Sequence, residues 1–221
     1  MEITVSGTGR SSLRPERATL HLTAGFESGD KAEAMSEATR VVNELSADLR
    51  RLKELDPSPT TWSAVLPIGT RSWRPWTDSG QLVPMRHSAH ARIMVKFRDF
   101  PTLAGFADHW GGRPGVTLGH IEWTLTEARQ KETERSVLAQ AVEVARERAQ
   151  VLATAAGAGE VRCLEVSDPG MLGHRTEGEP MMLAASRSAY AKDAGGGGEG
   201  IEIAPEDVDI EATVHARFTA D

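Results

Sequence analysis

Regular alternation of apolar and polar residues marks three long segments of the chain. In residues 18–26, apolar side chains occupy every second position from Ala18 to Phe26, with mostly polar residues between them. Residues 89–97 and 208–218 repeat this period of two, which is typical of a β-strand with one buried face. Shorter strands are predicted at residues 2–8, 60–68, 119–125 and 160–166.

Apolar residues at steps of three and four predict helices elsewhere. The first helix begins at Asp30, which forms a possible capping box with Glu33, and stops before Pro57. A second helix is predicted over residues 126–156, and a third, shorter one after Asp99. The residues predicted to face the core are Ala34, Ala38, Val41, Leu45, Leu49, Leu52 and Leu55 in the first helix, Leu138, Ala141, Val142, Ala145, Ala149, Leu152 and Ala156 in the second, and Leu103, Phe106 and Trp110 in the third.

The predicted elements follow the order β-β-α-β-β-α-β-α-β-β. Because the long strands are amphipathic, they favour a largely antiparallel sheet that is covered on one face. Placing all helices on one side of a single sheet hides every apolar face. We therefore predict an α+β fold, a two-layer sandwich with two long helices and one short helix on one face of the sheet. The whole chain, residues 1–221, is predicted to form a single domain with long loops at residues 69–88 and 168–200.

Composition narrows the class of protein. The 221 residues are 39% hydrophobic and 26% charged, as in globular domains that bury a substantial core. The formal net charge of −7 argues against a nucleic-acid partner held by overall charge, and leaves a local basic patch open. Cys163 is the only cysteine, so neither an intramolecular disulfide nor a thiolate zinc site is expected.

Targeting signals are absent from the given sequence. No stretch approaches the roughly 20 apolar residues that a transmembrane helix needs. The first residues enter a strand pattern at once and lack the basic and apolar regions of a signal peptide. We therefore expect a cytoplasmic location, or a periplasmic one if the chain is a processed form.

Motifs for common catalytic chemistry are also absent. The sequence has no P-loop, no G-x-S-x-G nucleophile elbow and no H-E-x-x-H zinc motif. Gly7-Thr8-Gly9 follows a strand, but another strand comes next, so the helix N-terminus of a dinucleotide site is missing. We predict no catalytic residue, no cofactor and no enzymatic activity.

Three histidines occupy the polar phase of the three longest strands: His21, His90 and His215. If these strands are neighbours in one sheet, the imidazoles could meet Glu122 or Glu211 and form a zinc site. The competing interpretation is that the histidines are solvated or paired across strands.

The loop at residues 69–88 carries an unusual cluster of guanidinium and indole groups, which can bind aromatic groups or a partner's surface. Its members are Arg71, Trp73, Arg74 and Trp76. The competing interpretation is that both indoles fold back over the edge of the sheet. Because the chain is acidic overall, the cluster favours a protein partner over nucleic acid.

Several segments of the chain resemble the SIMPL domain family. Residues 3–9 are similar to the opening strand of the family, and Pro15-Glu16-Arg17-Ala18 is similar to its turn into the next strand. The central strand, the alanine-rich helix and the closing pair of strands of the family resemble residues 89–99, 139–157 and 201–218.

The resemblance implies an α+β domain without an established enzymatic activity. Some relatives from the cell envelope assemble into ring-like or channel-like homo-oligomers, and an animal relative is an adaptor that associates with a signalling kinase. We therefore expect a non-enzymatic protein that acts by homo-oligomerisation or protein binding, through a strand edge or the loop at residues 69–88. The alternative is a metal-dependent or small-molecule-processing enzyme that uses the polar sheet face around His21, His90 and His215.

Overall fold

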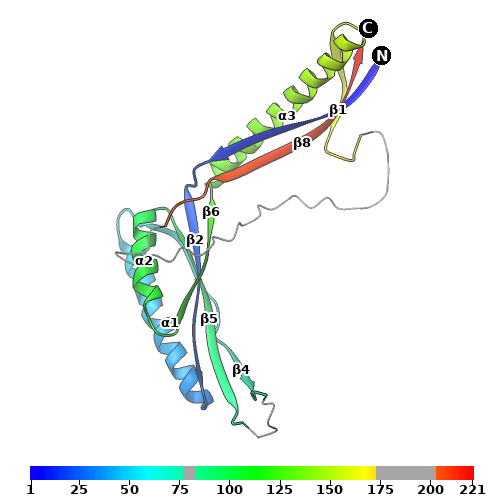
Figure 1. Cartoon of the computed structure of the whole chain (residues 1–221). Coiled ribbons are helices and arrows are strands. Elements are labelled where there is room, and N and C mark those ends of the chain that lie inside the picture. The colour runs from blue at the N-terminus through cyan, green and yellow to red at the C-terminus, as the bar shows by residue number, and fades with distance from the viewer. Residues whose placement is uncertain (77–82, 173–202) are drawn as a thin grey trace. The chain divides into compact units, whose positions relative to one another are not determined.

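The computed structural model describes residues 1–76, 83–172 and 203–221. These residues form two compact units, each built around its own antiparallel sheet (Figure 1). Of the described residues, unit 1 contains 1–14, 125–172 and 207–221, and unit 2 contains 15–76, 83–124 and 203–206.

Unit 2 is a sheet with two helices on one face. The strand order is β3-β5-β2-β6, and β4 pairs with the first half of β5. If β3 and β4 are counted as one interrupted edge strand, the chain follows the βαββαβ order of the split-βαβ, or ferredoxin-like, arrangement. Its elements are β2 (Arg17–Ser28), α1 (Lys31–Glu54), β3 (Thr60–Val65), β4 (Gly69–Trp73), β5 (Arg86–Phe97), α2 (Phe100–Gly111) and β6 (Val116–Thr124).

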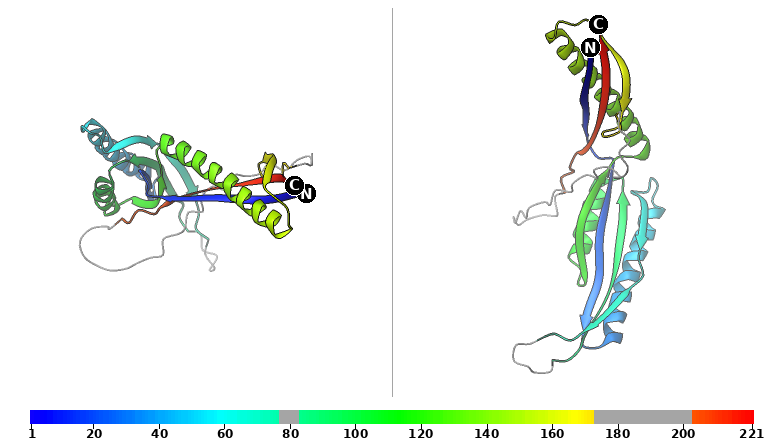
Figure 2. Two further views of the ribbon diagram at one scale, coloured as in Figure 1. Left: turned by 90° about the horizontal axis from the view of Figure 1, so that it is seen from above. Right: turned by 90° about the vertical axis from the view of Figure 1, so that its right-hand side faces the viewer.

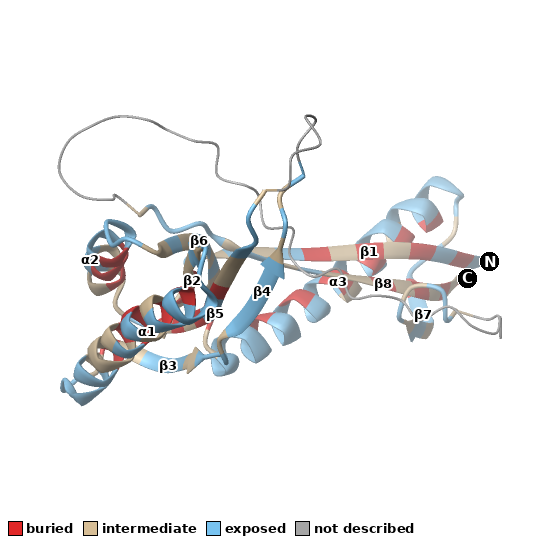
Figure 3. Cartoon of the chain, turned by 90° about the horizontal axis from the view of Figure 1, so that it is seen from below, coloured by how far each residue is buried: buried red, intermediate tan, exposed pale blue. Residues whose placement is uncertain are grey.

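The core of unit 2 lies between the two helices and the central strands β2 and β5. The apolar phases of these strands are buried, as the red bands in Figure 3 show. Complete burial of a large aliphatic or aromatic side chain contributes about 1.5–3 kcal/mol to folding, so the sheet and helices depend on one another. The largest fully buried side chains of this core are Trp110, Phe97, Leu20, Leu45, Ile93, Leu103 and Val95.

Side-chain caps begin both helices of unit 2 where the sequence predicts. The Asp30 carboxylate accepts the backbone N–H of Ala32 at 2.8 Å, and the Asp99 carboxylate accepts that of Thr102 at 2.8 Å. Glu33 accepts the Ser28 hydroxyl, so the reciprocal bond of a capping box is replaced by a bond to the preceding strand.

Unit 1 is a three-stranded sheet covered by one long helix (Figure 2). Its elements are β1 (Glu2–Leu13), α3 (Glu127–Ala155), β7 (Val161–Ser167) and β8 (Val208–Ala220), in the strand order β1-β8-β7. The last strand of the chain, β8, therefore lies between the first strand, β1, and β7.

Small residues let α3 lie very close to β1. The buried stripe of the helix repeats every four residues, and four of its members are alanines. Gly7 and Gly9 of β1 face this stripe, and an added Cβ at either position would overlap the helix backbone, at the carbonyl oxygens of Ala141 and Val137 respectively. The stripe consists of Thr133, Val137, Ala141, Ala145, Ala149 and Ala153.

The α+β class, the antiparallel strands and the predicted order of elements are confirmed, with β4 as an additional strand. The prediction of a single sheet is wrong, because the described strands form two sheets. The predicted loop at 69–88 is also too long, since β4 and the start of β5 occupy both of its ends. Most of the predicted loop at 168–200 lies outside the described residues. The prediction of a single domain stays a prediction, and the structure adds that the chain forms two compact units.

The long helices α1 and α3 have charged outer faces. In α1, Arg40 donates to Glu44 at 2.8 Å, one turn further along the helix.

No helix in the described segments combines the length and the hydropathy that crossing a membrane requires. The predicted cytoplasmic location stays a prediction.

Substitution of Gly7 by Ala should destabilise unit 1 by about 1–3 kcal/mol, because the new methyl group collides with the α3 backbone. It would lie 2.5 Å from the Ala145 nitrogen and 2.8 Å from the Ala145 Cβ. Urea unfolding of the variant measures the change. The matched control is Gly105→Ala in α2, where a Cβ meets nothing within 4 Å and better helix propensity should raise stability by about 1 kcal/mol. Equal stability of the Gly7 variant and the wild type would contradict the close packing.

Candidate functional site

The face of the unit 2 sheet that points away from α1 and α2 is the main candidate surface, and we name it the open face. In β5, Ile93, Val95 and Phe97 point to the helices, so the alternate positions point away from them. The strand registers identify their neighbours. The open face consists of Thr19, His21, Thr23 and Glu27 of β2, Arg86, Ser88, His90, Arg92, Met94 and Lys96 of β5, Trp62 and Ala64 of β3, Arg71 and Trp73 of β4, and His120 and Glu122 of β6.

Cationic side chains are concentrated on this face of an otherwise acidic protein. Arg86, Arg92 and Lys96 occupy alternate-phase positions of β5, and no carboxylate of the described residues forms an ion pair with any of them. The acidic side chains of the open face are Glu27 and Glu122. The open face therefore has a local positive charge, although the whole chain carries −7.

Indole groups lie beside these cations. Trp62 of β3 is directly opposite Lys96 in the strand register, and 49% of its surface is exposed. On β4, the Arg71 guanidinium lies 5.8 Å from the centre of the Trp73 ring, within the range of a cation–π interaction. Side chains of this kind are enriched at protein interfaces.

A stacked pair of imidazoles lies next to Glu122. The rings of His21 and His120 are 4.2 Å apart and inclined by 15°, because a register shift between β2 and β6 places His120 beside His21. His21 Nε2 is buried without a hydrogen bond among the described residues, and Glu122 approaches it to 3.8 Å. Burial lowers the pKa of His21 first, followed by the neighbouring His120, whereas Glu122 opposes the shift.

The strand arrangement on which the three-histidine zinc site depends is not present in the described sheets. His21 and His90 lie on neighbouring strands of unit 2, but His90 is opposite Gly25, four residues from His21 along β2. His215 lies on β8, in the other sheet, so the three strands are not neighbours in one sheet. Glu211 is also on β8 and pairs with Arg10 at 3.1 Å. Across residues 1–76, 83–172 and 203–221, no group of three or more His, Cys, Asp and Glu side chains could hold a metal ion.

The arginine and tryptophan cluster is divided between β4 and the segment that follows it. Arg71 and Trp73 belong to β4, which is exposed along almost all its length (Figure 3). Arg74 and Trp76 come next, and Trp76 is 84% exposed. The interpretation that both indoles fold back over the sheet is therefore wrong for Trp76, whereas Trp73 is half-buried.

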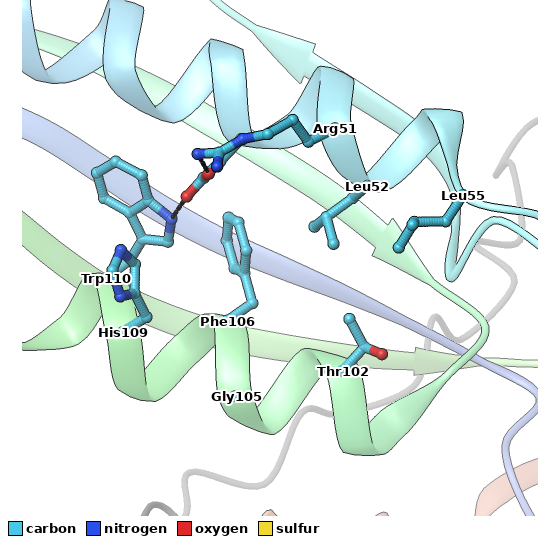
Figure 4. Close-up of a pocket in the computed structure, with 9 residues that line it drawn as sticks. Arg51, Leu52, Leu55, Thr102, Gly105, Phe106, His109 and Trp110 are labelled. Carbon is cyan, nitrogen blue, oxygen red and sulfur yellow. Dashed lines mark hydrogen bonds and ion pairs between the residues drawn. The ribbon is translucent and has the colours of Figure 1, made fainter.

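A shallow groove of about 400 Å³ separates α1 from α2 on the other side of the sheet (Figure 4). Its polar end is closed by Asp48, which accepts the Trp110 indole N–H at 3.1 Å and pairs with Arg51. Leu52 and Phe106 line its apolar part. The Asp48 carboxylate links α1 to α2, so helix packing is sufficient to explain why it lies at this groove.

The histidine pair should make stability depend on pH. Because the pKa of His21 in the folded protein lies below its ordinary value of 6.5, the unfolded state binds more protons near that pH. The free energy of unfolding should therefore decrease as pH falls through 6.5. His120→Asn removes a like charge and should raise the His21 pKa, whereas Glu122→Gln should lower it further. NMR titration of the His21 ring protons measures both shifts, and a wild-type pKa above 6.5 would contradict them.

Comparison with known proteins gives one family. None of the curated proteins matches the chain. The model of the SIMPL family, described as a protein of unknown function (DUF541), matches residues 3–218. The match spans strands and helices of both compact units. The chain therefore belongs to the SIMPL family.

Proposed function

We propose that the protein is not an enzyme and that it acts by binding an acidic segment of a partner protein on the open face. The observation that carries this proposal is the set of cations on β5, Arg86, Arg92 and Lys96, which lack carboxylate partners in the described part of the chain. Carboxylates of a partner can pair with these cations, and complementary charge of this kind orients and speeds association.

The neighbouring indoles favour a protein partner over a polyanion held by charge alone. Trp62 and Trp73 border the cationic strand on its β3 and β4 side. Aromatic and arginine side chains together supply both contact area and hydrogen bonds at interface hot spots. A long polyanion would extend beyond the open face and meet the rest of a protein whose net charge is −7. A short acidic peptide segment would meet only the cationic open face, because salt screens more distant charges.

The edge of the sheet offers a further contact. The Leu66 N–H donates to the Arg92 carbonyl at 2.9 Å, so even-numbered residues of β5 direct their backbone groups towards β3 and β4. The register then leaves the backbone groups of Thr70 and Ser72 on the outer edge of β4. An extended partner segment could pair with this edge and place acidic side chains on the open face.

A small-molecule-processing enzyme on the same face is the second candidate, favoured by the stacked imidazoles of His21 and His120 beside Glu122. Metal analysis and native mass spectrometry of protein purified without chelator distinguish the two candidates. A stoichiometric metal or small molecule that is lost in the His21→Ala variant would favour the enzyme.

Reversal of charge on the open face should weaken partner binding about tenfold, or on the order of 1.4 kcal/mol. The test variant is Arg92→Glu with Lys96→Glu. The control, Arg135→Glu with Arg146→Glu on the exposed side of α3, changes the net charge equally. Quantitative affinity capture from cell extract compares both variants with the wild type. Equal recovery of the same partners by all three proteins would contradict the proposal, and selective loss of nucleic acid instead would identify a different ligand.

Removal of the indoles should have a similar effect without a change in charge. The variant Trp73→Ala with Trp76→Ala loses the aromatic part of β4 and of the segment after it, and should reduce capture about tenfold. Val151→Ala, an exposed apolar truncation on α3, is the control. Capture yields and native masses identical to the wild type would exclude these side chains from binding.

A further inference from the structure

The two edges of the unit 1 sheet differ in how they are protected. At β1, Gln140 of α3 accepts the Arg10 backbone N–H at 3.0 Å, and Arg148 approaches the Ser6 carbonyl oxygen at 3.5 Å. These contacts occupy backbone groups that would otherwise pair with another strand. The edge at β1 is therefore partly blocked by the helix.

The other edge, β7, exposes apolar side chains. Leu164 is 54% exposed and Val166 is 43% exposed, and Cys163 is also exposed. Within the described residues, β7 pairs with β8 alone. An edge strand with exposed apolar side chains is a site at which another strand can add.

Backbone groups of β7 also point away from the sheet. The Val161 N–H donates to the Gln150 side chain at 3.0 Å and not to β8. Because backbone groups alternate in direction along a strand, the N–H and C=O of Cys163, two residues further along, also point away from β8. A register shift between Cys163 and Glu165 then brings Glu165 opposite Arg217, and the backbone groups of Val166 point away from β8. Among the described residues, α3 side chains therefore occupy only the first donor of β7, the Val161 N–H, and a strand that pairs there has to displace Gln150.

The sequence of β7 is complementary to itself in the antiparallel direction. Residues 161–166 read Val-Arg-Cys-Leu-Glu-Val. When two copies align Val161 with Val166, each Arg162 comes opposite a Glu165 of the other copy, and Cys163 comes opposite Leu164. Arg162 and Glu165 lie opposite Thr219 and Arg217 of β8, so both are on the same face of the sheet. Within its own chain Arg162 also pairs with Asp221 at 2.5 Å and Glu165 with Arg217 at 3.8 Å, so the second copy adds to ion pairs that already exist. Opposite charges and apolar pairs at facing positions each stabilise a strand pair by roughly 0.2–1 kcal/mol.

From this complementarity we propose that two copies of the protein associate through β7, in antiparallel register, to form a two-fold symmetric dimer. The pairing joins two three-stranded sheets into one sheet of six strands. Because the two-fold axis is perpendicular to the sheet, both α3 helices lie on the same face of it. This interface goes beyond the proposed function, since it uses a different unit of the chain and a second copy as the partner.

Cross-linking through Cys163 tests the dimer directly. As the only cysteine, it allows a short bismaleimide to link two chains only when their β7 strands are adjacent. We expect the wild type to sediment with twice the monomer mass of 23.9 kDa and to give a covalent dimer. Cys163→Ser should abolish the cross-link.

Charged substitutions separate the interface from the fold. Leu164→Lys with Val166→Lys should reduce the native mass by half and prevent cross-linking, while the circular dichroism spectrum stays unchanged. Val151→Lys, on the exposed side of α3, should leave the dimer intact. If the wild type sediments as a monomer at every protein concentration measured, the proposal is overturned. A dimer that survives the double substitution would also overturn it.

The two proposals can fail independently. The Leu164→Lys, Val166→Lys variant should still capture partners through the open face, and the Arg92→Glu, Lys96→Glu variant should still form the dimer. Loss of partner capture in the β7 variant, with the dimer also lost, would show instead that binding requires two copies.

Discussion

The antiparallel pairing of β2 with β5 is the interaction on which unit 2 depends. It fixes eleven residue pairs, from Ala18 opposite Phe97 to Ser28 opposite His87. Because side chains alternate between the two faces, this register sends the apolar residues of both strands, except Met94, to α1 and α2 and every cation of β5 to the opposite face. A shift by one residue would bury Arg92 and Lys96, so the core and the open face are determined by the same constraint.

Local patterns predict the elements well, because their causes are local. The alternation in residues 18–26 and 89–97, and the caps at Asp30 and Asp99, each lie within a few residues of the structure that they predict. The division into two sheets could not be predicted, because it depends on which distant strands pair. β8 pairs with β1, more than 190 residues earlier in the chain, so His215 and His21 share a pattern but not a sheet.

The candidate site was predictable only in part, for the same reason. The guanidinium and indole groups of β4 were visible as a cluster, since Arg71 and Trp73 are close in sequence. Trp62 and His120 join the site through cross-strand registers, and the His120 contact also depends on a local shift in the β2–β6 pairing. In α3, Leu138 and Leu152 were predicted to be buried but are exposed, because the helix packs through a strict four-residue stripe of mainly alanines that faces two glycines.

The two surfaces use different physical interactions, which has a consequence for how they respond to salt. Binding on the open face depends on exposed charges, so it should weaken as ionic strength rises and the Debye length falls to about 8 Å at 0.15 M. Pairing through β7 depends mainly on backbone hydrogen bonds and on apolar contacts around Leu164 and Val166, so salt screens only its Arg162–Glu165 pairs. The proposed dimer should therefore depend less on ionic strength than the association with an acidic partner does.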